Sequence, residues 1–103
     1  MAGPIIYNVT INVDDEIREE WLDWMRRVHI PDVMNTGCFT SWRLCRLLVE
    51  EEKGTTFAIQ YTAASLEDFE KYQKNFAAEL QRQHSEKFRD RFVAFRTLLE
   101  QLE

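Results

Sequence analysis

The sequence predicts an α+β domain in which a four-stranded antiparallel sheet carries two helices on one face. With 103 residues, 45% hydrophobic and 13% aromatic, the chain suits one compact domain that can build its own core. Several segments alternate apolar and polar residues, which indicates strands with one buried face. Two segments between them repeat apolar residues at helical spacing. We therefore treat residues 1–103 as a single domain.

Composition argues against several classes of partner. Thirteen Lys and Arg against eighteen Asp and Glu give a net charge of −5, and the charges are interspersed. This pattern predicts no basic face for nucleic acid or for an anionic membrane surface. No apolar run approaches the roughly 20 residues that cross a bilayer, and no signal segment opens the chain. We expect a soluble, cytoplasmic protein.

The first half of the chain predicts a strand followed by a helix. Residues 4–13 alternate, with Ile5 and every second residue after it on the buried face. Asp14 is an expected N-cap for a helix whose apolar stripe includes Trp21 and Trp24, two expected core residues. Pro31 should end that helix, and residues 31–37 should form a short further turn.

The second half predicts a hairpin, a helix and a last strand. Residues 38–49 are rich in β-formers but place Arg43 and Arg46 on opposite faces, which an edge strand tolerates best. A charged turn over 50–54 leads to an alternating strand over 55–63. Ser65 then caps a helix with an apolar stripe reaching Phe88, and residues 92–99 form the final strand.

This order of elements is the ferredoxin-like βαββαβ arrangement. Right-handed crossovers place the first and third strands at the centre of the sheet, the second and fourth at its edges, and both helices on one face. The opposite face has no cover within the chain. We therefore expect a homodimer with two sheets face to face, as in a dimeric α+β barrel.

The uncovered face is also the expected place for a ligand or an interface. If Val49 pairs with Thr55 across a five-residue loop, strand pairing decides which side chains share this face. A four-residue loop would turn the second strand over. With the five-residue loop, the face carries Ile6 and Leu48 together with the candidate site residues Asn8, Thr10, Trp42, Leu44, Arg46, Gln60 and Arg96.

Four side chains are weighed for chemistry. His29 is a candidate catalytic acid or base, although we favour the simpler interpretation that it complements the dipole at a helix C-terminus. His84 lies at the edge of an apolar stripe and is expected to be partly buried. Arg46 and Arg96 are candidates for binding a carboxylate or phosphate together, but bonds across a dimer interface are the favoured alternative.

The sequence predicts neither a metal site nor a cofactor. Cys38 and Cys45 are expected on one strand, about 23 Å apart at roughly 3.3 Å per residue, which is too far for a disulfide. Cys45 is expected to face the helices as a buried thiol. The two histidines and two cysteines fall on separate elements, so three or four metal ligands do not converge. No glycine-rich phosphate loop or nucleophile elbow is present.

Five strings in this order resemble an uncharacterised family of small bacterial proteins described as a domain of unknown function: IIYNVTINVDD, HIPDV, TSWRLCRLLVEEE, TTFAIQYT and FVAFRTLLE. They cover nearly the whole chain. The resemblance implies a ferredoxin-like subunit of the dimeric α+β barrel kind, and it brings no activity and no catalytic residues. Residues 1–3 precede the resemblance and are expected to be disordered.

Two functions of different class follow from these observations. We favour a non-catalytic homodimeric module that binds a small ligand or a protein partner. The alternative is a cofactor-independent monooxygenase or isomerase acting on a small aromatic or polyketide-like compound. The alternative requires a closed cavity between the sheet and the helices that contains His29 or an arginine.

Overall fold

The computed structural model describes residues 3–103 and has the predicted ferredoxin-like fold. Residues 1 and 2 of the segment expected to be disordered lie outside the described residues. A 3₁₀ turn, η1 (Asp15–Ile17), precedes the first helix, and a π-helical turn, η2 (Met25–His29), joins α1 to α2. In chain order the main elements are β1 (Ile5–Val13), α1 (Arg18–Trp24), α2 (Ile30–Met34), β2 (Ser41–Arg46), β3 (Thr55–Ala63), α3 (Leu66–Asn75), α4 (Ala77–Lys87) and β4 (Phe92–Glu100).

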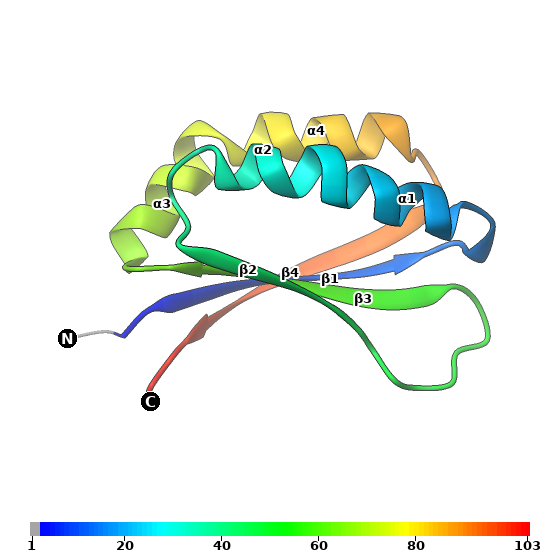
Figure 1. The fold of residues 1–103 in the computed structure, drawn as a ribbon, viewed down its shortest axis with the longest axis horizontal. Helices are drawn as coiled ribbons and strands as arrows, with labels where there is room; N and C mark the ends of the chain where they lie inside the picture. The colour runs from blue at the N-terminus through cyan, green and yellow to red at the C-terminus, as the bar shows by residue number, and fades with distance from the viewer. Residues whose placement is uncertain (1–2) are drawn as a thin grey trace.

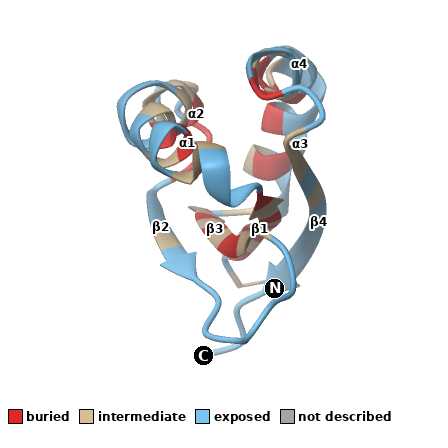
Figure 2. Ribbon diagram, turned by 90° about the vertical axis from the view of Figure 1, so that its right-hand side faces the viewer, coloured by how far each residue is buried: buried red, intermediate tan, exposed pale blue. Residues whose placement is uncertain are grey.

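The four strands form one antiparallel sheet in the order β2-β3-β1-β4. The first and third strands are central and the second and fourth are edges, as the sequence predicts. All the helices lie on one side of the sheet, and the other side has no cover within the chain (Figures 1 and 2). No helix among residues 3–103 is long and apolar enough to cross a membrane.

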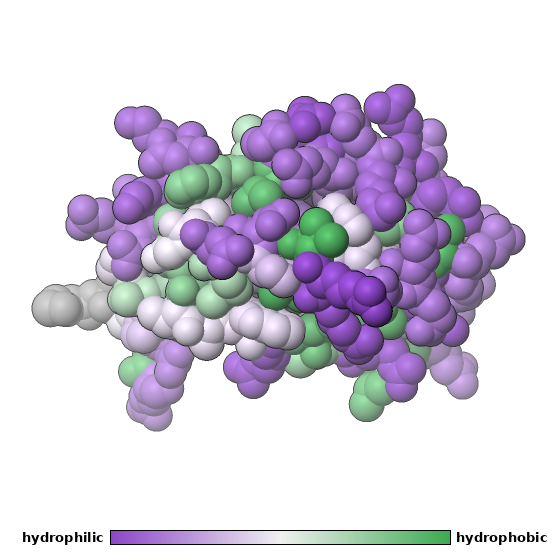
Figure 3. Space-filling model, turned by 45° about the horizontal axis from the view of Figure 1, so that its top comes forward, coloured by the Kyte–Doolittle hydropathy of each residue, from purple (hydrophilic) through white to green (hydrophobic). Residues whose placement is uncertain are grey.

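The core lies between the sheet and the helices. Alternate residues of β1 are buried from Ile5 to Val13, which confirms the predicted inward face. Trp21 is fully buried, and Trp24 packs against the core from the same helical segment. On the helix side, hydrophilic side chains cover most of the surface and apolar ones show mainly between the helices (Figure 3). Burial of one face of each element is what holds the two layers together.

The helical segment after β1 does not end at Pro31, contrary to the prediction. It continues to Met34, with Pro31 in the first turn of α2. Proline lacks the N–H that a helix interior needs, and its ring presses on the carbonyl four residues earlier. The wider π-helical turn at Met25–His29 comes directly before it, where the Ile30 N–H bonds to the Met25 carbonyl. This turn lets the helix continue through the proline.

Strand β2 pairs with β3 one residue away from the predicted register. Leu44 pairs with Ile59, so Trp42, Leu44 and Arg46 lie on the helix side and not on the uncovered face. Cys45 is exposed on the uncovered face and not buried beneath the helices. A slip of one residue turns every side chain of a strand over, and the loop length decides the slip.

Hydrogen bonds attach the hairpin loop to strands β1 and β3. The Glu51 carboxylate accepts a hydrogen bond of 3.0 Å from the Thr56 N–H, and the Asn12 amide donates to the Lys53 carbonyl at 3.3 Å. These bonds hold residues 47–54 as one folded loop, which is longer than the five residues assumed from the sequence. The alternation of apolar and polar residues in the sequence does not predict side-chain hydrogen bonds of this kind.

Arg96 also lies on the helix side, which corrects its predicted place on the uncovered face. It pairs with Val9, whose side chain is in the core. Strand β4 carries large apolar residues on both of its faces, so its pattern does not show which face is inward. Because β2 and β4 are opposite edges of the sheet, Arg46 and Arg96 do not converge within one chain.

The second helical segment begins as predicted and is then interrupted. The Ser65 hydroxyl accepts a hydrogen bond of 3.2 Å from the Asp68 N–H, which confirms the N-cap of α3. Phe76 leaves the helical region at φ −129° and ψ −32°, and α4 starts after it. Asp14, in contrast, makes no side-chain cap bond, because its carboxylate accepts a hydrogen bond of 2.8 Å from Arg91.

Candidate functional site

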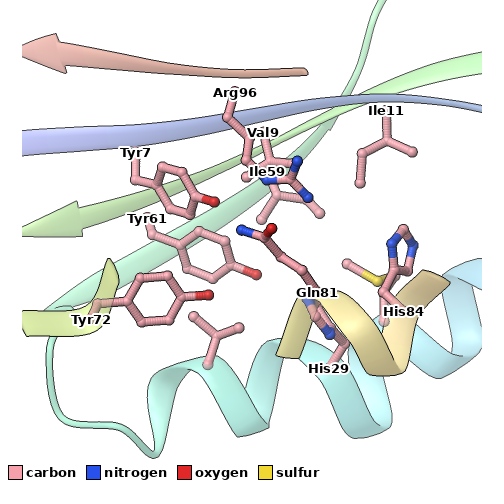
Figure 4. A pocket seen from close by; sticks show the side chains of 12 residues that line it. Tyr7, Val9, Ile11, His29, Ile59, Tyr61, Tyr72, Gln81, His84 and Arg96 are labelled. Carbon is pink, nitrogen blue, oxygen red and sulfur yellow. The ribbon is translucent and has the colours of Figure 1, made fainter. Parts of the chain in front are cut away.

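A small cavity with both polar and apolar lining lies between the sheet and the helices (Figure 4). The centre of a water molecule has about 20 Å³ available there, enough for one or two waters. Strands β1, β3 and β4 form one wall, and η2, α2, α3 and α4 form the other. Its lining residues are Tyr7, Val9, Ile11, Met25, His29, Val33, Ile59, Tyr61, Tyr72, Gln81, His84 and Arg96.

Three tyrosines from three elements stand together at one end of the cavity. The ring of Tyr7 lies 6.1 Å from that of Tyr61 and 5.8 Å from that of Tyr72, centroid to centroid. Their hydroxyls point the same way, toward the space that Gln81 enters from α4 (Figure 4). Burial raises the pKa of all three phenols. At neutral pH they are therefore uncharged hydrogen-bond donors.

His84 is buried and held in one tautomer. Its Nε2 accepts a hydrogen bond of 2.9 Å from the Trp21 indole N–H, so Nδ1 carries the proton of the neutral ring. Burial lowers the pKa of His84 to about 3, and the nearby His29 and Arg96 add to the effect. The prediction of partial burial was right in direction, but the side chain is almost completely enclosed.

His29 ends the π-helical turn and faces the same cavity. Its ring stacks on Trp24 with 5.2 Å between the ring centroids. Burial lowers the pKa of His29 to about 4, with Asp32 opposing the shift. The favoured prediction for His29 was wrong, because the helix continues past it and gives it no terminal dipole to complement. The ring is therefore a neutral base inside the domain at physiological pH.

Two buried polar atoms at this site have no hydrogen-bond partner. They are the Tyr61 hydroxyl and His29 Nδ1, and within residues 3–103 no other buried side-chain nitrogen or oxygen lacks one. Both residues line the cavity. Leaving a buried polar group unpaired costs about 1–3 kcal/mol, so such groups need an explanation. Both atoms face the cavity, where a bound ligand could form hydrogen bonds with them.

Arg96 is the one formally charged side chain that lines the cavity. It is exposed and makes no ion pair with any carboxylate in the described part of the chain. Its charge and its polar contact with Tyr7 oppose the rise in the pKa of that phenol. Arg96 and Tyr7 also line a groove outside the cavity, between α3 and β4. Arg96 thus lies where the cavity meets the surface.

The remaining predicted site residues lie elsewhere. Asn8, Thr10 and Gln60 are on the uncovered face as expected, where the Asn8 amide donates to Thr10 at 3.0 Å and accepts from Gln60 at 3.3 Å. Trp42, Leu44 and Arg46 line a surface groove between β2 and the first helix. No cluster of three His, Cys, Asp or Glu side chains suited to a metal ion occurs in residues 3–103.

Sequence reasoning missed the tyrosines and Gln81. Tyr7, Tyr61 and Tyr72 fit the apolar patterns of their elements, which predict ordinary core residues. A signal was available, because a buried tyrosine normally finds a partner for its hydroxyl and aliphatic residues would fill the same positions without one. Gln81 follows the buried Leu80, and only the packing of α4 over the sheet shows that it points inward.

A family model described as a domain of unknown function (DUF4286) matches residues 4–102. This is the kind of family that the sequence resembles. No curated protein matches the chain in sequence.

Solved structures of similar fold cover nearly the whole chain. An EthD-like protein from Ralstonia eutropha has a TM-score of 0.72 at 14% identity, with 100% of this chain and 96% of that chain covered. The cofactor-independent oxygenase SnoaB from Streptomyces nogalater, in a mutant form, has a TM-score of 0.68 at 13% identity, with 99% and 96% covered. A dimeric ferredoxin-like protein from an uncultured marine organism has a TM-score of 0.65 at 11% identity, with 97% and 96% covered. These identities show a shared fold only.

Proposed function

Because the chain belongs to the DUF4286 family, a domain of unknown function, its role has to be inferred from its own site, and we propose that it binds a small molecule in the cavity between sheet and helices. The observation that carries this proposal is the pair of unpartnered buried atoms at the cavity, Tyr61 Oη on the sheet wall and His29 Nδ1 on the helix wall. A ligand that bonds to both would remove a cost that the free protein carries.

A ligand larger than one or two waters requires the cavity to enlarge at its mouth. Gln81 is half-buried and Arg96 is exposed, and both are long side chains that change rotamer easily. When they swing outward, the cavity joins the groove between α3 and β4, which is lined by Phe69, Gln73 and Leu98 among others.

We also propose that the protein is a homodimer packed through its uncovered sheet face. Strand β4 exposes Val93, Phe95 and Leu99 on that face, with 70%, 63% and 45% of their surface accessible. A row of large apolar side chains on one strand is typical of an interface. The polar network of Asn8 and Gln60 lies beside it and suits the more polar part of a contact.

Native mass spectrometry of the untagged protein, purified gently from its own host, tests binding and assembly together. We expect a dimer that retains a small molecule of reproducible mass on each chain. The same preparation of a Tyr61→Phe variant should retain less of it. A wild-type protein that carries no extra mass, and gains no stability from extracts of its host, would contradict the binding proposal.

Stability measurements on the ligand-free protein test the unpartnered hydroxyl directly. We expect Tyr61→Phe to raise the free energy of unfolding by about 1 kcal/mol, because the variant removes a buried group that has no partner. Tyr72→Phe is the matched control, since its hydroxyl is not among the buried unpartnered atoms. If Tyr61→Phe is the less stable protein, the hydroxyl has a partner in solution and the argument fails.

A second candidate function is cofactor-independent catalysis, as a monooxygenase or an isomerase on a small aromatic or polyketide-like compound. His29 favours it, because an uncharged imidazole with an unengaged nitrogen can take a proton from a bound molecule. Arg96 at the same cavity would stabilise the anion that results. SnoaB, an oxygenase of this fold, works without a cofactor.

Oxygen consumption and product analysis together distinguish the two candidates. A catalytic protein should consume O₂ or isomerise a hydroxylated aromatic compound, and His29→Gln should abolish turnover while binding remains. A protein that binds such compounds and leaves them unchanged is a binding module.

A further inference from the structure

We infer that the ligand of this cavity is a hydroxylated aromatic monoanion, oriented with its hydroxyl at His29 and Tyr61 and its negative group at Arg96. The inference rests on the proposed binding function and names the class of molecule that the site would select. It follows from three features of the lining: its charge, its unpaired atoms and its rings.

The charge of the lining calls for one negative charge on the ligand. Arg96 lines the cavity mouth without a carboxylate partner in residues 3–103, and no Asp or Glu is among the lining residues. His29, His84 and the tyrosines are uncharged at neutral pH. The site therefore carries a single positive charge, which a carboxylate or another planar monoanion complements with two parallel hydrogen bonds.

The unpaired atoms favour a hydroxyl at the end of the ligand that lies away from Arg96. Tyr61 Oη has an O–H to donate, and the neutral His29 ring has an unengaged Nδ1 that can accept. A ligand hydroxyl satisfies both at once, because its oxygen accepts from Tyr61 while its own proton is donated to His29. A hydroxyl both donates and accepts, so it can pair with both atoms in either tautomer of His29, which a group that only accepts or only donates cannot do.

The rings call for an aromatic body between these two groups. The rings of Tyr7, Tyr61 and Tyr72 gather at one end of the cavity, and apolar side chains such as Val9 and Ile59 line it from the sheet (Figure 4). Aromatic faces and flat apolar surfaces favour a planar ring over a flexible chain.

Three simple probes separate these requirements: 4-hydroxybenzoate, 4-hydroxybenzamide and benzoate. The amide lacks the charge and benzoate lacks the hydroxyl, while the ring is the same. We expect wild-type protein to bind 4-hydroxybenzoate at least tenfold more tightly than either of the others, measured by titration of the tyrosine ring signals in NMR spectra. Arg96→Gln should abolish the preference for acid over amide, and Tyr61→Phe should weaken the preference for 4-hydroxybenzoate over benzoate.

Arg43→Gln is the matched control for Arg96, because Arg43 is an exposed arginine on the other edge strand. It should bind all three probes as wild type does. Equal binding of acid and amide would overturn the inferred charge, and equal binding of 4-hydroxybenzoate and benzoate would overturn the inferred hydroxyl, with small-molecule binding itself still standing. If no probe binds, the inferred class is wrong, and the retained mass in native spectra decides whether another ligand occupies the cavity.

Discussion

At the scale of single residues, the cavity is defined by groups that the fold keeps uncharged. His29 and His84 sit beside Arg96 in a space where protonation of either ring would place a second positive charge near the first. The Trp21 indole fixes which nitrogen of His84 is protonated. These constraints make the two histidines sensitive to acid, and this sensitivity is measurable in the stability of the whole domain.

We expect the free energy of unfolding to fall as pH drops below about 6.5. The two histidines have pKa values of about 4 and about 3 in the folded protein, against an ordinary value of 6.5, so the unfolded chain binds more protons in this window. Stability is fully present above pH 6.5 and declines toward pH 4, by up to about 1.4 kcal/mol per pH unit for each histidine. Denaturant titrations at pH 7, 6 and 5 measure the slope.

The His29→Gln variant measures how much of the pH dependence of stability comes from His29. It should reduce the pH dependence by up to about 1.4 kcal/mol per pH unit, because one of the two depressed pKa values is removed. Gln73→His, at an exposed helix position, adds a histidine that is free to titrate and should leave the slope unchanged. An unchanged slope in His29→Gln would mean that His29 is solvated in solution.

At the scale of elements, local sequence patterns predict where a helix begins better than they predict whether it continues without interruption. Ser65 caps α3 as predicted, because its hydroxyl accepts from a backbone N–H three residues away and needs no tertiary partner. Pro31 gave a misleading signal, because a π-helical turn accommodates it. That turn also places Met25 and His29 at the cavity, so the interruption of regular helix coincides with the candidate site.

Ser65→Ala should lower the free energy of unfolding by about 1 kcal/mol, because the Asp68 N–H at the start of α3 loses its acceptor. Ser85→Ala is a useful comparison, since Ser85 lies exposed within α4 and alanine is the better helix former there. We expect the two serine variants to change stability in opposite directions in thermal or denaturant unfolding. A neutral Ser65→Ala would show that water replaces the cap without cost.

At the scale of the whole molecule, one face of the sheet is not covered by any other element of the chain. Its helices occupy one side of the sheet only (Figures 1 and 2). Strand β4 exposes Phe95, Val93 and Leu99 on the other side. In the proposed dimer a twofold axis brings the same residues of both copies into contact. A single substitution on this face therefore changes the interface at two positions, one in each copy.

Phe95→Glu should weaken dimerisation by roughly 100-fold or more, because two buried aromatic side chains are replaced by two carboxylates. Leu98→Glu is the matched control, as Leu98 is comparably exposed on the same strand but on the helix side of the sheet. Sedimentation equilibrium over a range of concentrations measures both. Loss of the dimer in Leu98→Glu but not in Phe95→Glu would place the interface elsewhere.

The amino-acid sequence alone determined the order of elements, the central and edge strands, the buried face of β1 and the cap at Ser65. Each of these depends on local spacing or on rules of chain connection that hold in any domain. The tertiary structure decided which way the edge strands face. A bonded loop shifted β2 by one residue, and β4 has apolar residues on both sides, so no pattern within either strand could place Trp42, Arg46 or Arg96. The cavity also depends on which way β4 faces. Arg96 and His29 line the same cavity only because β4 and the π-helical turn pack on opposite sides of one core.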